Sequence, residues 1–318
     1  MIASRRAVLA GAALFASGDA RAQARPIRLL VGFAPGGATD IAARLLQPLM
    51  TASLGQPIVV ENRSGGGGNV ATDLLIRAEP DGTTLMVATP GQMVVNPLLD
   101  RASTFDAARD ITAIGQMTTG PLLLVVPAGS PFTTAAELLA AARARPGAMN
   151  YASAGVGSSM HVAGEMLKAY GALQIEHVPY RGSGPAVTDL VAGKVDFMID
   201  SVSTTTSHIR SGVLRVLAVT GDQPYADFPD AVPLNSLVPG VVLTTWLGLV
   251  GPAGLPVPVL ERLSTSLQAA VASPAFAGRL RELGSQAFWA GPQAFAAHLA
   301  AERQRAADVV RRANIRLE

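Results

Sequence analysis

The stretch VGFAPGGATDIAARLL, Val31 to Leu46, sets the pattern of the fold. Its apolar start is typical of a buried strand, Pro35-Gly36-Gly37 breaks that strand, and the residues that follow have helical spacing. The proline stiffens the turn, the two glycines allow close backbone approach, and Thr39 or Asp40 can cap the helix. The outward-facing N–H groups at such a helix start suit an anion, especially a carboxylate.

The same alternation continues along the chain. Apolar runs such as PIVVENR, TTLMVAT and PLLLVVP alternate with helical patterns such as NVATDLLIRAE and TAAELLAAARAR. The last third, from WLGLVGP onward, is mainly helical in pattern. Strands that alternate with helices predict an α/β fold with mainly parallel sheets flanked by helices.

Two similar segments suggest how the 318 residues are divided. Val126–Pro131 (VPAGSP) and Gly251–Pro256 (GPAGLP) each follow an apolar strand and precede a helix. If they mark domain crossings, residues 25–126 and 237–318 form one domain and residues 127–236 form a second. The alternative is that both are ordinary strand-to-helix turns.

The N-terminus has the pattern of a secretory signal in residues 1–24. Arg5 and Arg6 precede an apolar run from Ala7 to Ala16, and small residues lead to Ala22-Gln23-Ala24. The run is shorter than the roughly 20 residues that span a bilayer, so we expect an exported, soluble protein. The paired arginines leave both general secretory and twin-arginine export open.

The charge balance and the cysteine count exclude several classes of protein. Removal of residues 1–24 takes three arginines and one aspartate from 25 basic and 23 acidic residues, which leaves 22 of each. No basic run remains to follow a phosphate backbone, so nucleic acid is not an expected partner. The chain has no cysteine, which excludes disulfides and thiolate sites.

A second loop repeats the design of the first. In YASAGVGSSMHVAGE, Tyr151 to Glu165, glycines and hydroxyl groups precede a helix. If the two loops belong to different domains, they can clamp a ligand between them. The loop residues proposed as ligand contacts are Ser153, Gly155, Gly157, Ser158 and Ser159.

Other conspicuous residues carry weaker signals. The glycine tract Asn62–Asp73 matches neither a P-loop nor a dinucleotide fingerprint, so we interpret it as a turn capped by Asn69 that can form a wall of the cleft. The four histidines lack metal-ligand spacing, and neither a metal nor a cofactor is expected. Asp200 follows a buried strand and is interpreted as a helix cap, while Ser201 is a candidate ligand donor.

The chain resembles the Bug-type solute-binding receptors of the tripartite tricarboxylate transporter family. The resemblance covers nearly the whole chain and rests on seven ordered blocks. They are PIRLLVGFAPGGATDIAARLL, LGQPIVVENRSGGGGNVATDLL, PDGTTLMVAT, MNYASAGVGSSMHVAGEML, VPYRGSGPAVTDLVAGKVDFMIDS, GVLRVLAVT and WLGLVGPAGLPVPVLERL.

This resemblance implies a two-domain periplasmic binding protein of the type II-like architecture, with the ligand cleft between the domains. The receptor would be a monomer that closes over a small organic acid and delivers it to a membrane permease. The implied ligand contacts are Phe33, Ala34, Pro35, Gly36, Gly37, Ala38, Thr39, Asp40, Thr89, Ser153, Ala154, Gly155, Gly157, Ser158, Ser159, Tyr180, Gly182 and Ser201. Residues 90–93 and 202–206 depart from the family pattern, so the distal part of the pocket is expected to be unusual.

Two other functions remain open from the sequence. A receptor of this kind can signal to a sensor kinase instead of supplying a permease, and the same closed surface would serve either partner. An exported hydrolase could use Ser153 with His161 or another histidine. The sequence around Ser153 lacks the first glycine of the Gly-x-Ser-x-Gly nucleophile elbow, which argues against the hydrolase.

Overall fold

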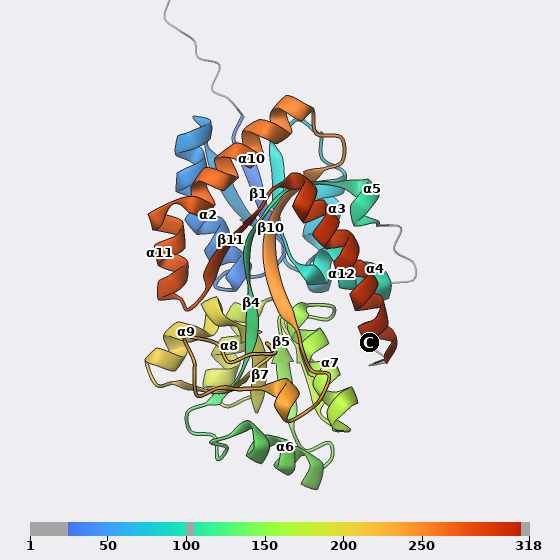
Figure 1. Cartoon of the computed structure of the whole chain (residues 1–318), viewed down its shortest axis with the longest axis vertical. Coiled ribbons are helices and arrows are strands. Elements are labelled where there is room, and N and C mark those ends of the chain that lie inside the picture. Colours follow the sequence, from blue (N-terminus) through green and yellow to red (C-terminus); the bar gives the residue numbers. More distant parts are fainter. Residues whose placement is uncertain (1–24, 100–104, 313–318) are drawn as a thin grey trace, which may run out of the picture.

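The computed structural model describes residues 25–99 and 105–312 (Figure 1). The predicted signal peptide, residues 1–24, lies outside these ranges. Within them, no helix has the length and apolar character required to cross a membrane. The described chain forms two lobes that share one continuous sheet of mixed strand direction, flanked by helices.

The first lobe is built on three parallel strands in the order β2-β1-β3. In register, Leu29 of β1 lies opposite Val60 on one side and Leu85 on the other. Helices and further strands from both ends of the chain surround them. Its elements are β1 (Ile27–Val31), α2 (Ala38–Leu54), β2 (Ile58–Asn62), η1 (Gly66–Gly68), α3 (Asn69–Ile76), β3 (Thr84–Ala88), η2 (Gly91–Val95), α4 (Asn96–Leu99), α5 (Ala107–Asp110), β10 (Thr244–Pro252), α10 (Val257–Ala272), α11 (Pro274–Glu282), β11 (Gln286–Ala290) and α12 (Pro292–Arg312).

The second lobe repeats this arrangement with the parallel order β7-β5-β6. Tyr151 of β5 lies opposite His177 of β6 and Phe197 of β7. Its elements are α6 (Ala135–Ala144), β5 (Asn150–Ser153), α7 (Ser159–Gly171), β6 (Glu176–Pro179), α8 (Ser183–Val191), β7 (Phe197–Ser201), α9 (Val202–Arg210), β8 (Leu214–Val219), β9 (Val232–Pro233) and η3 (Leu234–Ser236).

One long strand, β4 (Ile111–Pro127), joins the lobes. Residues 111–121 pair with β10 in the first lobe, and residues 122–127 pair with β7 and β8 in the second. These pairings are antiparallel, as are those of β10 with β3 and of β11 with β4. The α/β prediction is confirmed, but the sheet is mixed because the strands that link the lobes run against the parallel sets.

The central strands are buried on both faces, which explains their uninterrupted apolar sequences. In β1, Leu29 packs toward α2 and α10, whereas Leu30 packs toward α3 and α12. In β7, Ile199 packs toward α6 and α7, whereas Met198 packs toward α8 and α9. Each lobe therefore has helices on both sides of its sheet.

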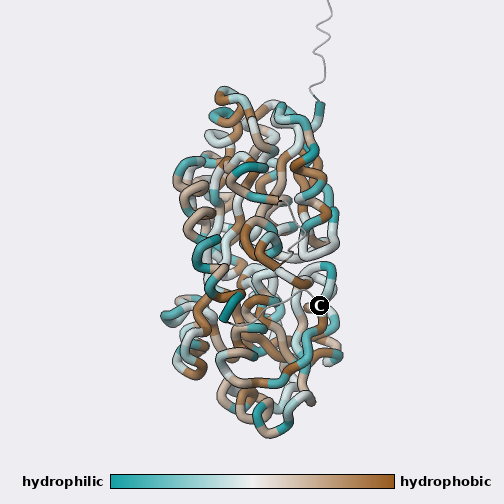
Figure 2. The backbone as a smooth tube through the Cα atoms, turned by 90° about the vertical axis from the view of Figure 1, so that its right-hand side faces the viewer, coloured by the Kyte–Doolittle hydropathy of each residue, from teal (hydrophilic) through white to brown (hydrophobic). Residues whose placement is uncertain are grey.

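Helix α12 extends from the first lobe to the second. It packs through Phe295 and Leu299 in the first lobe, and Val309 and Val310 near its end pack against the core of the second. Figure 1 shows α12 running past the middle of the elongated molecule to the side of the second lobe, and Figure 2 shows the elongated shape from a second direction. The helix is thus a further connection between the lobes beside β4 and the segment that leads into β10.

Two predicted helix caps in the first lobe are wrong. The N-cap of α2 is Gly37, without a side-chain hydrogen bond, and neither Thr39 nor Asp40 occupies that position. Helix α3 begins at Asn69 itself, after Gly68 in a left-handed conformation. The side chain of Asn69 instead accepts a hydrogen bond from Asn96, a long-range contact that local sequence does not reveal.

Candidate functional site

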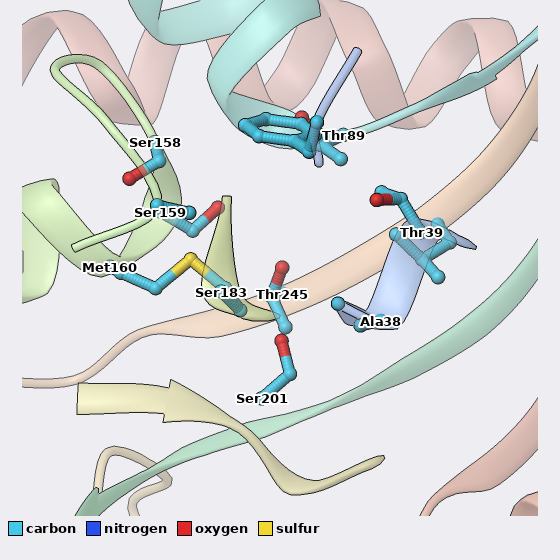
Figure 3. Close-up of a pocket in the computed structure, with 13 residues that line it drawn as sticks. Ala38, Thr39, Thr89, Ser158, Ser159, Met160, Ser183, Ser201 and Thr245 are labelled. Atoms are coloured by element: carbon cyan, nitrogen blue, oxygen red, sulfur yellow. The ribbon is translucent and has the colours of Figure 1, made fainter. Parts of the chain in front are cut away.

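A cavity lies between the lobes, where the parallel strands end and helices begin (Figure 3). The first lobe and the second lobe both contribute to the wall. The lining residues are Phe33, Gly37, Ala38, Thr39, Thr89, Ala154, Ser158, Ser159, Met160, Ser183, Ser201, Thr245 and Leu247.

Four helix N-termini converge on this cavity. Ala38 begins α2, Ser159 begins α7 and Ser183 begins α8, while Ser201 is the N-cap of α9. Each start presents unpaired backbone N–H groups and the positive end of a helix dipole. Within the described residues, the wall contains no lysine, arginine or histidine. The arrangement therefore favours an anion held by backbone N–H and hydroxyl groups, as the sequence predicts.

Asp40 holds the first loop from behind. Its carboxylate accepts hydrogen bonds from the Gly36 N–H at 3.1 Å, from Arg44 Nε at 3.0 Å and from Asn62 Nδ2 at 3.0 Å. Asn62 also donates to the Phe33 carbonyl oxygen. Burial alone would raise the pKa of Asp40, but these three hydrogen bonds outweigh it and hold the pKa below its usual value. Asp40 stays ionised at neutral pH and fixes the turn without lining the cavity.

Replacing Asp40 with alanine is expected to weaken carboxylate binding by about tenfold or more. The change leaves the Gly36 N–H and the Asn62 amide without their acceptor, and each such loss costs about 1–3 kcal/mol. Calorimetric titration of the purified receptor measures the change. Asp40→Asn, which keeps one acceptor oxygen, is expected to lie between wild type and Asp40→Ala; equal affinity of all three proteins would contradict the role.

The second loop is held by its own helix. Ser158 caps α7 by accepting the His161 N–H, and His161 Nδ1 in turn accepts the Gly157 N–H at 3.0 Å. Gly155 and Gly157 have φ values of 127° and 78°, which side-chain-bearing residues rarely adopt. His161 therefore positions the loop that presents Ser158 and Ser159 to the cavity.

Ser153 lies behind this loop and is fully buried. Its Oγ lies 2.7 Å from His177 Nε2 and accepts the Gly155 N–H at 3.0 Å. The other ring nitrogen of His177 has no hydrogen-bond partner within the described chain, so no carboxylate completes a triad. Burial lowers the pKa of His161 to about 4 and that of His177 to about 3, so both rings are neutral at pH 7.

Asp200 lies directly behind the floor of the cavity. Its Oδ1 accepts hydrogen bonds from Ser183 Oγ at 2.8 Å and from the Ser201 N–H at 2.7 Å. Its Oδ2 has no partner among the described residues. Burial raises the pKa of Asp200 to about 7. The carboxyl group holds the Ser201 N–H at the start of α9, but the predicted capping role of Asp200 is wrong, because Ser201 is the N-cap residue and α9 has no side-chain cap hydrogen bond.

Glycines allow the lobes to meet beside the cavity. A Cβ placed on Gly184 of α8 would lie 2.2 Å from the Pro35 carbonyl oxygen, and one on Gly182 would lie 2.7 Å from the Ala34 nitrogen. The Ala34 N–H donates to the Arg181 carbonyl oxygen at 2.8 Å. The first loop and the start of α8 are therefore in direct backbone contact across the cleft.

The glycine tract forms another wall of the cleft, beside the second loop. A Cβ on Gly67 would lie 2.1 Å from the Val156 carbonyl oxygen. Asn96 donates to the Gly67 carbonyl oxygen, and its Oδ1 would lie 1.7 Å from a Cβ on Gly157. The tract thus acts through close backbone packing and not through phosphate binding.

The predicted contacts divide into two groups. Those that line the cavity are Phe33, Gly37, Ala38, Thr39, Thr89, Ala154, Ser158, Ser159 and Ser201. Those that lie in the supporting loops are Ala34, Pro35, Gly36, Asp40, Ser153, Gly155, Gly157, Tyr180 and Gly182, where for example the Tyr180 hydroxyl donates to Asp189.

The sequence reasoning missed four lining residues: Met160, Ser183, Thr245 and Leu247. Ser183 could have been found, because the sequence RGSG has the same strand-turn-helix pattern as the first two loops. Thr245 and Leu247 belong to β10, which reaches the cavity through long-range pairing with β4, so no local signal identifies them. No group of three or more potential metal-ligating side chains occurs in residues 25–99 and 105–312.

Known proteins resemble this chain over most of its length. A family model described as "Tripartite tricarboxylate transporter family receptor" matches residues 42–315. A protein from the tcbD–tcbE intergenic region of a Pseudomonas species is 39% identical over 310 residues, covering 95% of this chain and 92% of that protein. Protein BugT of Bordetella pertussis is 33% identical over 298 residues, covering 93% of this chain and 91% of that protein.

Solved structures show the same fold. The periplasmic binding protein BugD matches with a TM-score of 0.89 and 30% identity, covering 93% of this chain and 99% of that one. An R. palustris protein with adipate matches with a TM-score of 0.88 and 32% identity, covering 92% of this chain and 98% of that one. MatC from Rhodopseudomonas palustris with bound malate matches with a TM-score of 0.86 and 30% identity, covering 90% of this chain and 99% of that one.

Proposed function

The chain belongs to the tripartite tricarboxylate transporter receptor family, and from this premise we propose that it captures a small carboxylate and delivers it to a membrane permease. The observation that supports this proposal most is the convergence of four helix N-termini on a cavity lined by hydroxyl groups, to which the described residues contribute no basic side chain. Charge-assisted hydrogen bonds to such donors contribute about 1.5–3 kcal/mol each. Two or three of them are sufficient to hold one carboxylate.

We propose that the two lobes are the domains that close over the ligand. The chain passes between them within β4, near Pro121 and Leu122, and again near Leu243 at the entry to β10. These positions replace the boundaries after residues 126 and 236 that the sequence pattern suggests. Lobes that are joined by few chain segments and that touch through backbone atoms across a cleft are typical of hinge closure. We propose that the partner recognises the closed form.

The receptor is proposed to act as a periplasmic monomer, exported by residues 1–24. A role in signalling to a sensor kinase uses the same closed surface and remains the second candidate. Hydrolysis is less favoured because Ser153 is fully buried behind the second loop and the wall of the cavity does not include it. Turnover of an activated ester that disappears in Ser153→Ala would favour the hydrolase instead.

Calorimetry against matched ligands tests the proposal. The panel includes acetate, propionate, succinate, malate and adipate, each compared with its neutral amide. We expect at least one carboxylate to bind about a hundredfold more tightly than its amide, because each 1.4 kcal/mol changes affinity tenfold and several charge-assisted bonds are lost in the amide. Binding of amides or cations with no binding of any carboxylate would refute it.

A further inference from the structure

A second space, called the second chamber below, adjoins the cavity on the side of β4. The two spaces share Ala38, Ser201, Thr245 and Leu247, so they lie side by side. The further walls of the second chamber come from α2, β4, α9, α11 and the turn before β11. They are Ala42, Thr118, Thr119, Gly120, Pro121, Val202, Ser203, Leu280 and Ser285.

The second chamber is rich in hydroxyl groups that the protein does not use. Ser201 and Ser203 are only 6% and 8% exposed, yet neither hydroxyl has a hydrogen-bond partner within residues 25–99 and 105–312. On the same helix, Thr205 and Thr206 bond to backbone carbonyls of the preceding turn, whereas Thr204 Oγ1 is buried without a partner among the described residues. Neither oxygen is fully buried, so both hydroxyls are open to the chamber, where a polar ligand group can complete their hydrogen bonds.

The charges around the second chamber disfavour a carboxylate there. No charged side chain lines it in the described structure. Asp200 lies immediately behind Ser201 and is fully buried. Its carboxyl group accepts a hydrogen bond from the Ser201 N–H at the start of α9. It has no cationic hydrogen-bond partner among the described residues. A ligand carboxylate beside α9 would lie next to a second carboxyl group, and two such groups at close range resist joint ionisation.

We propose that the second chamber receives the distal end of the ligand and that this end is uncharged and hydroxylated, so the ligand is a hydroxylated monocarboxylic acid. The inference rests on the proposed function, because the carboxylate is placed against α2 and α7 in the first cavity. The hydroxyl groups of Ser201, Ser203 and Thr119 then exchange hydrogen bonds with hydroxyl groups of the ligand.

Three acids of six carbon atoms test this inference. Gluconate carries a hydroxylated end, hexanoate an apolar end and adipate a second carboxylate. We expect gluconate to bind at least tenfold more tightly than either, because a site with buried hydrogen-bonding groups rejects ligands that leave them unpaired. Equal or tighter binding of hexanoate or adipate overturns the inference, while the proposed function stands if any acid binds; binding of none refutes the function itself.

Variants of the second chamber separate its role from that of the first cavity. Ser203→Ala and Thr119→Val are expected to weaken gluconate about tenfold and to leave propionate, which is too short to reach them, unchanged. Ser207→Ala, on the exposed side of α9, is the matched control. Asp200→Asn is expected to reduce the difference in affinity between adipate and gluconate, since it removes the competing carboxyl group. Unchanged gluconate binding in Ser203→Ala and Thr119→Val overturns the inference, and so does an unchanged difference in a folded Asp200→Asn protein.

Discussion

Replacing Gly184 with alanine is expected to weaken ligand binding at least a hundredfold while the ligand-free protein keeps its stability. The added Cβ would lie 2.2 Å from the Pro35 carbonyl oxygen, and both partners of that contact are backbone atoms on opposite lobes. Neither can move without separating the start of α8 from the first loop. Gly184 lies inside a helix and is not in the left-handed region, so alanine fits its backbone without strain.

The measurement combines calorimetric titration with thermal unfolding of the ligand-free protein. Gly278→Ala is the matched control, because Gly278 also lies within a helix, α11, and a Cβ there meets nothing within 4 Å. The control is expected to bind normally. If Gly184→Ala binds as tightly as the control, the lobes do not need this contact in the bound state, and closure on the first loop is contradicted.

The sequence was informative where a structure is specified locally. The first stretch predicts a strand, a turn and a helix, and the structure has β1 up to Val31, the turn at Pro35–Gly37 and α2 from Ala38. The second loop follows the same rule, with Ser158 as the N-cap of α7. In both places strand propensity, glycine and helix-start residues lie within a few positions of one another, so the signal is contained in the stretch itself.

What the sequence could not show depends on contacts between distant residues. Nothing near β4 indicates that one half pairs with β10 and the other with β7 and β8. Asp40 is a residue type that often caps helices, yet its carboxylate accepts hydrogen bonds from Asn62 and Arg44 behind the turn. The second chamber is lined by residues of α2, β4, α9, β10 and α11, and no single stretch carries the pattern of a site there.

Acidification is expected to destabilise the protein strongly, because two neutral histidines are buried behind the second loop. The rings of His161 and His177 stack at 4.3 Å, and burial lowers their pKa values to about 4 and about 3. The unfolded chain binds protons near pH 6.5, the ordinary value for histidine. The stability that these side chains support is therefore complete above pH 6.5 and is lost as the pH falls toward 4 and 3. Each unit of pKa difference corresponds to about 1.4 kcal/mol, so the two together can offset much of a typical stability of about 5–15 kcal/mol.

Urea unfolding at a series of pH values between 4 and 7 measures this dependence. In the wild-type protein each histidine is expected to add up to about 1.4 kcal/mol per pH unit to the slope of unfolding free energy against pH. His177→Gln keeps a polar partner for Ser153 but cannot titrate, so its slope should be smaller by about one proton. His208→Gln, on α9 away from the second loop, should retain the wild-type slope. The same slope in His177→Gln and wild type would show that the buried pair does not control the acid response.

Protonation of His161 also removes the acceptor of the Gly157 N–H, so the second loop should loosen in the same pH range in which stability is lost.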